Sequence, residues 1–322
     1  MWLRWISVAV NLLVVFPAFP QTFGATYILS ENIIGDAFYS HFDWEAVPDP
    51  NHGRVNYVDQ ATSVAQNLTY ASSDSFILRT DYTSVLGIDG PGRNSVRIRS
   101  KNTYTTHVAI FDLRHMPQGC GTWPGVKEVK ESDKPKGGLV DIVEGVNDQP
   151  PNSISLHTTE GCTMPAKRRQ KGVSGQLDCN SLVNANEGCK VTDPALPDYG
   201  PQFNVMGGGW YVLERTEEHI SVWFWTRHDP SVPFEIKHGF LEVDSTTWGP
   251  PVAYFPNDDC NPMSKYFEEH NIIINLTLCG DWAGGPAYEQ AGCPSTCADF
   301  VNNNPAAFIE AYFDFAAVRV YI

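Results

Sequence analysis

Short segments with a β-strand pattern recur along almost the whole chain, and long helical patterns are rare. The segments are rich in β-branched and aromatic residues, several alternate apolar with polar positions, and Gly, Pro, Asn or Asp bound them. Many short strands without long helices between them favour two packed antiparallel sheets. We therefore expect an all-β sandwich. The expected strands are 75–82, 95–100, 107–113, 138–146, 153–158, 210–215, 220–227, 272–278 and 316–322.

Two short helices are expected near the end of the chain. In NPAAFIEAYF, Asn304 has the character of an N-cap and Pro305 suits the first helical position. PSTCADFV precedes it and is closed by the three asparagines 302–304. No change of composition and no internal repeat marks a second domain, so we expect a single domain over residues 25–322.

The first 24 residues have the pattern of a secretory signal peptide. Arg4 provides the positive start, residues 6–16 form an apolar run, and Thr22 and Gly24 supply small residues for cleavage near Gly24. The apolar run is shorter than the ~20 residues that a transmembrane helix needs. We expect a secreted protein that works in the extracellular space or the cell wall.

Two N-x-[ST] sequons agree with secretion and predict a glycoprotein. They begin at Asn67 and Asn275. Asn275 falls within an expected strand, so Asn67 is the better candidate for glycosylation.

The cysteine count indicates disulfide bonds. An even number of cysteines in a secreted chain favours disulfides over metal. Zinc would need clustered thiolates and histidines, and only Cys293 and Cys297 are close in sequence. Cys179 and Cys189 flank a polar loop and are expected to pair locally. All eight cysteines follow the signal segment: Cys120, Cys162, Cys179, Cys189, Cys260, Cys279, Cys293 and Cys297.

The charge balance restricts the partners. The formal net charge is −15, which makes nucleic acid and anionic membranes poor partners. Aromatic residues make up 12% of the chain and charged residues only 18%. This combination in a secreted protein favours neutral polymers, whose sugar faces stack on aromatic rings. We expect such a partner and a monomeric protein.

The stretch KPKGGLVDIVEGVN, residues 134–147, places carboxylates in an apolar strand. Leu139 and Asp141 are two residues apart and share a face, whereas a regular strand would turn Glu144 to the opposite face. A β-bulge would bring Glu144 back beside Asp141, and bulges are frequent next to active sites. Two neighbouring carboxylates raise at least one pKa, which suits a general acid. The alternative is that Glu144 points to solvent.

Nine stretches, in order and over nearly the whole chain after the signal, carry a specific resemblance. The chain resembles the fungal laminarinase-like branch of glycoside hydrolase family 16. The resemblance implies a β-jelly-roll, concanavalin-like sandwich whose concave cleft holds a β-glucan polysaccharide or oligosaccharide. It also implies endo-type, retaining cleavage of β-1,3 or mixed β-1,3/1,4 linkages, with no cofactor and no catalytic metal. The stretches are HGRVNYVD (52–59), GRNSVRIRS (92–100), HMPQGCGTWP (115–124), VDIVEGVN (140–147), SLHTTEGC (155–162), GGGWYVLER (207–215), VWFWTR (222–227), HNIIINLTLCGDWAG (270–284) and GCPSTCADFVNNNPAAF (292–308).

The family signature Glu-x-Asp-x-x-Glu maps onto the strand around Asp141. Asp141 matches the supporting carboxylate and Glu144 matches the acid/base. The nucleophile position falls on Leu139. Leucine has no lone pair, so it can neither attack the anomeric carbon nor stabilise a developing positive charge on the sugar.

Two lysines replace aromatic residues that the resemblance leads one to expect upstream of the signature. In the Trp-Pro-x-x-Trp stretch, Trp123 and Pro124 match, but the second tryptophan position reads Lys127. The tryptophan position just before the signature reads Lys134. A lysine stacks poorly on a sugar compared with an aromatic ring, so we expect a remade cleft floor.

Further residues are candidates for substrate binding. Arg93 and His157 match positions where the family contacts sugar, although a structural role is an equal alternative for His157. Trp123 belongs to the same cleft, and Asn147 directly follows the signature. Trp248 and Trp282 lie in Gly- and Pro-bounded loops, where binding residues concentrate.

Two functions remain open after this reading. The first is a β-glucan-binding pseudoenzyme whose hydrolysis is lost or strongly reduced, because retaining cleavage requires two carboxyl groups about 5–5.5 Å apart. The second is an active endo-β-1,3(4)-glucanase that uses a displaced carboxylate. Leu139, Lys127 and Lys134 together favour the first. Turnover of laminarin distinguishes the two.

Overall fold

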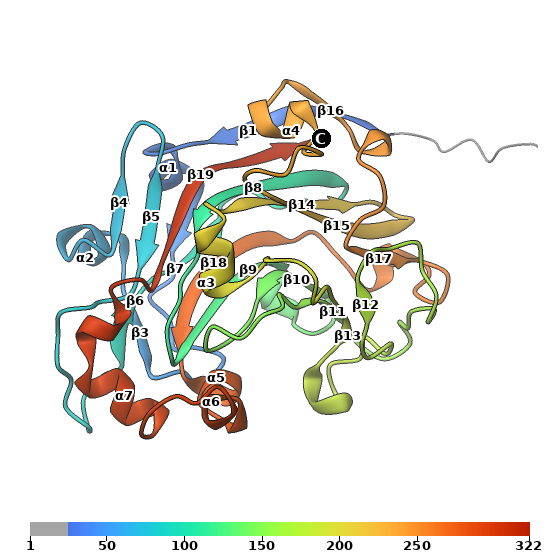
Figure 1. Cartoon of the computed structure of the whole chain (residues 1–322). Helices are drawn as coiled ribbons and strands as arrows, with labels where there is room; N and C mark the ends of the chain where they lie inside the picture. Colours follow the sequence, from blue (N-terminus) through green and yellow to red (C-terminus); the bar gives the residue numbers. More distant parts are fainter. Residues whose placement is uncertain (1–24) are drawn as a thin grey trace, which may run out of the picture.

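A computed structural model describes residues 25–322, and the expected signal peptide lies outside the described residues. Within this part of the chain, two large antiparallel sheets pack face to face, with short helices at the edges (Figure 1). The all-β sandwich expected from the strand pattern is confirmed. Among residues 25–322, no helix has the length and apolar character needed to cross a membrane.

One sheet of the described chain has nine strands. Its main path runs β16 (Glu242–Asp244), β1 (Thr26–Ile33), β19 (Tyr312–Tyr321), β8 (His107–His115), β14 (Gly209–Arg215), β15 (His219–Thr226) and β17 (Ala253–Pro256). Off this path, β5 (Phe76–Arg79) pairs with β19, and β4 (Thr69–Ala71) pairs with β5.

The other sheet has eight strands within residues 25–322. Its order is β12 (Val173–Ser174), β13 (Cys189–Thr192), β11 (Ile154–His157), β10 (Leu139–Glu144), β9 (Thr122–Val129), β18 (Asn271–Leu278), β7 (Arg97–Ser100) and β2 (Phe42–Trp44). The strand with the carboxylates, β10, therefore lies inside the sheet, between β9 and β11.

The remaining elements are short and lie at the edges of the sandwich. β3 (Val55–Tyr57) and β6 (Arg93–Ser95) form a separate parallel pair. The α-helices are α1 (Ala37–His41), α2 (Gln60–Ala65), α3 (Gly200–Val205), α4 (Phe234–His238), α5 (Gly280–Ala283), α6 (Pro286–Gln290) and α7 (Cys297–Asn303). The 3-10 helices are η1 (Glu131–Asp133), η2 (Asn184–Asn186), η3 (Ser245–Thr247), η4 (Met263–Lys265) and η5 (Pro305–Phe308).

The end of the chain corrects one expected helix. The segment from Asn304 forms only the short helix η5, and strand β19 already begins at Tyr312. Phe313 and Phe315 are fully buried in alternation along this strand. Pairing with β5 and β8 buries them, so tertiary packing prevails over the local helical signal. The other expected helix is confirmed as α7, with Thr296 as its N-cap.

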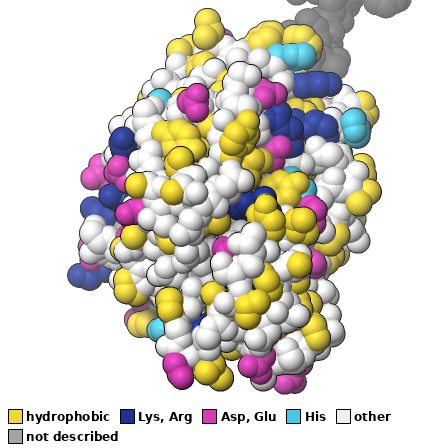
Figure 2. Space-filling model, turned by 90° about the vertical axis from the view of Figure 1, so that its left-hand side faces the viewer, with side chains coloured by type: hydrophobic (Ala, Val, Ile, Leu, Met, Phe, Trp, Pro, Cys, Tyr) yellow, Lys and Arg dark blue, Asp and Glu magenta, His cyan; other side chains and the backbone are white. Residues whose placement is uncertain are grey.

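The apolar core lies between the two sheets. Val140, Ile142 and Val143 of β10 face this core, as do Tyr211 and Leu213 of β14. A second apolar cluster covers the outer face of the nine-stranded sheet. On the molecular face shown in Figure 2, acidic and basic side chains are interspersed among uncharged ones.

All eight cysteines form disulfide bonds, as the sequence predicts. The local pair Cys179–Cys189 is confirmed, and it closes the loop that carries η2. The other three bonds are Cys120–Cys293, Cys162–Cys260 and Cys279–Cys297. Of the two sequons, Asn67 is exposed and Asn275 is buried in β18.

Candidate active site

A β-bulge in β10 brings Asp141 and Glu144 to the same face of the sheet. Asp141 pairs with Lys127 of β9 and Glu144 pairs with Gly125, with a register shift between Asp141 and Val143. The shift adds one residue to β10, so Glu144 lies two positions from Asp141 when counted along β9. The bulge predicted from the three-residue spacing is confirmed.

The side chain of Asn152 stabilises the bulge. Its amide oxygen accepts a hydrogen bond from the Glu144 backbone N–H at 2.9 Å, and its amide nitrogen donates to the Ile142 carbonyl at 2.8 Å. Asn152 is fully buried. Its amide thus pairs with two backbone groups that flank the bulge, and buried backbone groups require such partners.

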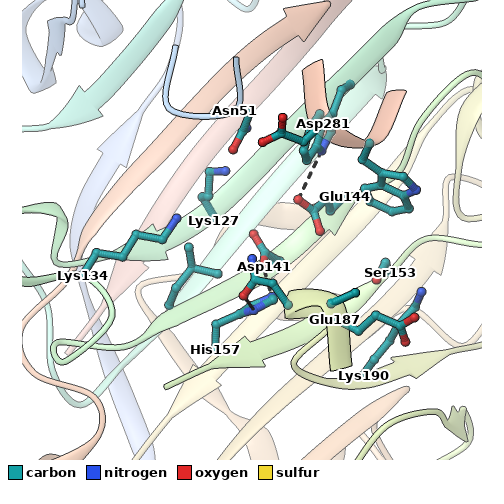
Figure 3. A pocket seen from close by; sticks show the side chains of 15 residues that line it. Asn51, Lys127, Lys134, Asp141, Glu144, Ser153, His157, Glu187, Lys190 and Asp281 are labelled. Atoms are coloured by element: carbon teal, nitrogen blue, oxygen red, sulfur yellow. Dashed lines mark hydrogen bonds and ion pairs between the residues drawn. The ribbon is translucent and has the colours of Figure 1, made fainter. Parts of the chain in front are cut away.

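A cleft of about 480 Å³ opens over the outer face of β10. Figure 3 shows Asp141 and Glu144 near its centre, with Lys127 and Lys134 on one side and Glu187 and Lys190 on another. The lining residues are Asn51, Trp123, Lys127, Lys134, Leu139, Asp141, Glu144, Ser153, His157, Ala185, Asn186, Glu187, Lys190, Asp281 and Trp282.

Asp141 is tied to its neighbours by hydrogen bonds. Its Oδ2 lies 3.2 Å from His157 Nε2 and accepts a hydrogen bond from Ser155 Oγ at 3.1 Å. Burial alone would raise the pKa of Asp141, but the bond to His157 and the positive charges of His157, Lys127 and Lys134 outweigh it and lower the pKa. Asp141 is therefore an anion whose carboxylate already interacts with His157 and Ser155.

His157 is the cationic partner of Asp141. Burial acts to lower its pKa, but the hydrogen bond and the charge of Asp141, with the charge of Glu144, raise it overall. Its Nδ1 lies 3.1 Å from Asn186 Oδ1, so a protonated ring donates on both sides. His157 thus faces the cleft and is also held by structural hydrogen bonds.

Glu144 has the opposite electrostatic character. Its pKa is raised to about 7, first because burial disfavours the charged form and second because Asp141 repels its negative charge. The Trp123 indole N–H donates to Glu144 Oε1 at 3.2 Å. At neutral pH about half of this carboxyl is protonated, so it can deliver a proton to a leaving oxygen. The reading that Glu144 points away to solvent is wrong.

Leu139 presents a hydrocarbon surface to the same cleft. It is 5% exposed and packs against Val129 of β9 and Ile273 of β18. In the antiparallel pairing of β10 with β11, Leu139 lies opposite His157. Lys127 and Lys134 line the cleft beside it, as expected from their positions near the signature.

Two tryptophans form one wall of the cleft. Trp123 and Trp282 meet edge to face, with ring centroids 5.6 Å apart. The ammonium of Lys190 lies 5.8 Å from the centroid of the Trp282 ring. Trp123, Trp282 and His157 therefore all reach the cleft, as the sequence predicts.

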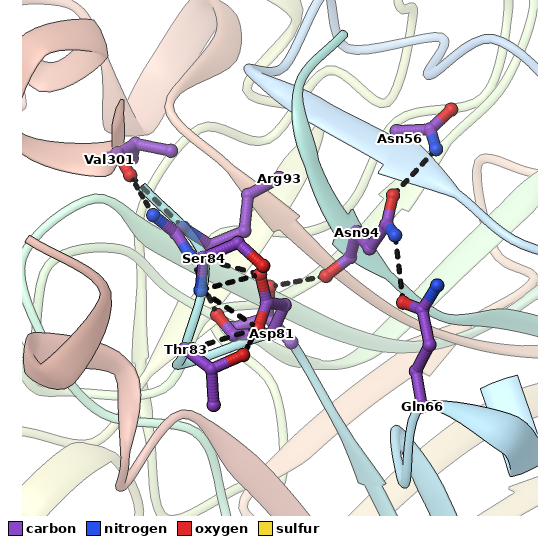
Figure 4. Close-up of polar contacts among 9 residues, drawn as sticks. Asn56, Gln66, Asp81, Thr83, Ser84, Arg93, Asn94 and Val301 are labelled. Atoms are coloured by element: carbon purple, nitrogen blue, oxygen red, sulfur yellow. Dashed lines mark hydrogen bonds and ion pairs between the residues drawn. The ribbon is translucent and has the colours of Figure 1, made fainter. Parts of the chain in front are cut away.

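Arg93 does not reach the cleft. It is fully buried, its Nε donates to the Val301 carbonyl at 3.0 Å, and its Nη1 donates to the Asp81 carbonyl at 3.1 Å (Figure 4). Its Nη2 also donates to the Val301 carbonyl, and an ion pair joins Nη1 to the Asp81 carboxylate at 3.4 Å. Arg93 ties β6 to α7, so the predicted sugar contact is wrong.

Asn147 and Trp248 are also corrected. Asn147 is 2% exposed, accepts from the Gly121 N–H at 2.7 Å and donates to the Ala283 carbonyl at 3.0 Å. It anchors α5, which carries Trp282, but does not line the cleft. Trp248 is 5% exposed and packs against Trp223 in the apolar cluster on the outer face of the nine-stranded sheet, away from the cleft.

Several lining residues were missed by the sequence reading. Asn186, Glu187 and Lys190 come from the loop that the Cys179–Cys189 bond closes and from the strand after it. Asp281 immediately precedes Trp282, and its Oδ2 lies 2.9 Å from His52 Nδ1. The signals available for Asp281 were the neighbouring Trp282 and the resemblance stretch 270–284 that contains both residues.

Comparisons with known proteins agree with this architecture. The model of XgeA-like catalytic domains of glycoside hydrolase family 16 matches residues 42–321. The chain is 39% identical over 309 residues to a probable glycosidase of Schizosaccharomyces pombe, covering 94% of this chain and 71% of the relative. It is 36% identical over 317 residues to an endo-1,3(4)-beta-glucanase of Arthroderma benhamiae, covering 96% of this chain and 68% of the relative.

Two solved structures share the fold closely. Laminarinase 16A from Phanerochaete chrysosporium, with beta-glucans in donor and acceptor sites, is 56% identical with a TM-score of 0.91, covering 92% of this chain and all (100%) of that one. An elongating family 16 beta-1,3-glucosyltransferase is 32% identical with a TM-score of 0.83, with the same coverage of 92% and 100%.

Proposed function

Because this chain belongs to the XgeA-like glycoside hydrolases of family 16, we propose that it binds β-1,3- or mixed β-1,3/1,4-glucan but has lost most or all of its retaining hydrolysis. The observation that carries the proposal is Leu139. Its hydrocarbon side chain lines the cleft, at the position that matches the nucleophile in the family signature. The acid position remains in Glu144, whose pKa of about 7 suits proton donation.

Asp141 is a poor replacement for the missing nucleophile. Its Oδ2 is engaged by His157 and Ser155, both within 3.2 Å. Attack on a sugar carbon requires placement to within about an ångström. To attack, Asp141 would have to break these bonds, and its side chain is one carbon shorter than that of a glutamate.

Glucan binding is supported by the tryptophan wall of the cleft. Trp123 and Trp282 expose aromatic surface to the cavity, beside polar groups such as Ser153 and Asn51. Apolar faces with a few polar groups are typical of sugar sites. We further propose that a secreted, monomeric domain meets its glucan outside the cell or in the cell wall.

A working endo-β-1,3(4)-glucanase is the second candidate. Two other carboxylates, Glu187 and Asp281, line the same cleft as Glu144. An inverting route would pair Glu144 with a carboxylate about 6.5–9.5 Å away. This candidate predicts that Asp281→Asn or Glu187→Gln abolishes turnover.

Two parallel measurements on one preparation test the proposal. New reducing ends are assayed after incubation with laminarin and with lichenan, and binding to the same glucans is measured by calorimetry. We expect binding without turnover. Turnover at the level of an ordinary family member would refute the loss of hydrolysis, and absence of binding to both glucans would refute the glucan partner.

A further inference from the structure

Lys127 is a nearly buried cation without a counter-charge in contact. It is 8% exposed, lies on β9 opposite Asp141, and its side chain lines the cleft. Across residues 25–322, it forms neither a hydrogen bond nor an ion pair. The stem of Lys127 is buried while its ammonium faces the open cleft, where an anionic group of a ligand can reach it.

Lys134 adds a second positive charge to the same part of the cleft. It follows η1 and lines the cavity together with Lys127 and Leu139. Its pKa is lowered, first by removal of water and second by repulsion from Lys127. Figure 3 shows the ends of both lysines turned toward the same part of the cavity.

The carboxylates of the cleft centre do not balance these charges. Asp141 is bonded to His157, which is itself a cation when protonated. Glu144 is only partly ionised at neutral pH and lies against Trp123. Of the other two carboxylates that line the cleft, Asp281 is paired with His52, and Glu187 lies beside Lys190 on another side (Figure 3). The part of the cleft over Leu139, next to Lys127 and Lys134, is therefore locally positive.

The acidic character of the whole chain does not cancel this local excess. The net charge of −15 belongs to residues spread over the whole sequence. Exposed charges are screened over about 8 Å at physiological ionic strength, whereas partly buried pairs are screened less. A ligand over Leu139 therefore responds first to Lys127, which is nearly buried, and next to Lys134, which is exposed but lines the same part of the cavity.

We propose that the cleft takes a glucan that carries an acidic group, held between Lys127 and Lys134 over Leu139. The proposal rests on the proposed glucan binding and refines its ligand class. Both ammonium groups donate charge-assisted hydrogen bonds to the anionic oxygens. Trp123 and Trp282 remain available to the sugar rings. A sugar carboxylate and a sulfate ester offer this same chemistry.

Three probes test the inference by calorimetry on the full protein: laminarin, laminarin oxidised at C6 to carboxylates, and laminarin sulfate. We expect one or both acidic glucans to bind at least about tenfold more tightly than laminarin, since charge-assisted hydrogen bonds are the stronger ones. Preference between the two acidic probes identifies the group. The advantage should shrink as salt is added.

Matched variants assign the effect to the cleft. Lys127→Gln and Lys134→Gln should each lower the affinity for the acidic glucan far more than the affinity for laminarin. Lys136→Gln removes the same charge from an exposed residue two positions further on, outside the cleft, and should change neither. Because Lys134 comes from a surface segment, its variant tests the idea even if Lys127→Gln fails to fold.

The outcomes separate this inference from the proposed function. Laminarin binding without any preference for acidic glucans overturns the inference and leaves the glucan partner standing. A preference for acidic glucans that survives both Lys127→Gln and Lys134→Gln also overturns it, because the acidic group of the glucan is then bound by other residues. Failure to bind any of the three probes refutes the proposed function itself.

Discussion

At the scale of single residues, the cleft combines a carboxyl group of raised pKa, Glu144, with an aliphatic side chain, Leu139. Glu144 has a pKa near 7 and Asp141 is held as an anion, an arrangement in which two carboxylates take different roles. Leu139 contributes neither charge nor lone pair. Under the proposed function, the absence of a carboxylate at position 139 is what prevents retaining cleavage.

Leu139→Glu should bring back measurable but incomplete cleavage of laminarin. The new carboxylate would stand beside Asp141 and Glu144, yet Lys127 and Lys134 would pair with it and would still replace aromatic subsite surface. We expect a rate at least about tenfold below that of an ordinary family member. Reducing-end assays measure this.

Leu139→Gln is the matched control for that variant. Glutamine has the size of glutamate but cannot act as the nucleophile, so it should leave turnover at the level of the unchanged protein. Full recovery with Leu139→Glu alone would mean that the two lysines do not impair the site.

Glu144→Gln should flatten the dependence of stability on pH. The folded pKa of about 7 lies above the ordinary glutamate value of 4.5, so protonated Glu144 favours the folded state. Its contribution to the free energy of unfolding is complete below the unfolded pKa and is lost as pH rises through 7. We expect the unchanged protein to lose roughly 2 kcal/mol more than the variant between about pH 5 and about pH 8.

Urea unfolding at the two pH values measures this difference. Glu187→Gln, which changes an exposed carboxylate of the same cleft, serves as the control and should keep the slope of the unchanged protein. Equal slopes for Glu144→Gln and Glu187→Gln would contradict the raised pKa of Glu144.

At the scale of elements, the bulged strand β10 defines the site. The bulge turns Ile142 and Val143 both toward the core, while Asp141 and Glu144 both face the cleft. The spacing of the two carboxylates predicts the bulge. Its partner Asn152 could not be foreseen, since it lies on the return toward β11 and reaches the bulge only through the folded turn.

Asn152→Ala should destabilise the protein through the bulge. The Glu144 N–H and the Ile142 carbonyl would both lose their side-chain partner in a buried place. An unsatisfied buried group costs about 1–3 kcal/mol, so we expect a loss of about 2–4 kcal/mol in the free energy of unfolding. Urea denaturation measures it.

Asn303→Ala in α7 is a suitable comparison for that variant. Asn303 is exposed and its amide contacts only the Asp299 carbonyl. Such surface changes stay within about 0.5 kcal/mol. A loss of that small size for Asn152→Ala as well would show that the bulge does not depend on Asn152.

At the scale of the whole molecule, charged residues connect the two sheets behind the cleft. Glu128 of β9 is fully buried and lies 2.7 Å from His107 Nε2 of β8 and 3.9 Å from Arg215 Nη1 of β14. Lys127 and Glu128 are neighbours in sequence, but one faces the cleft and the other faces the opposite sheet. The ion pairs of Glu128 therefore link β9, which forms part of the cleft floor, to strands β8 and β14 of the opposite sheet.

The sequence alone determined the sandwich, the pairing of cysteines as disulfides, and the strand that carries Leu139, Asp141 and Glu144. These follow from local rules: the two-residue period of a strand, the chemistry of side chains, and the three-residue spacing that requires a bulge.

Only the tertiary structure decided which distant residues meet at that strand. It buried Arg93 against Val301, placed Trp248 on the far sheet, and brought Lys190 and Asp281 into the cleft. The physical reason is that a side chain's neighbours depend on which strands pair and which loops the disulfides close. Those pairings join residues more than a hundred positions apart, as in Cys120–Cys293, and no local pattern records them.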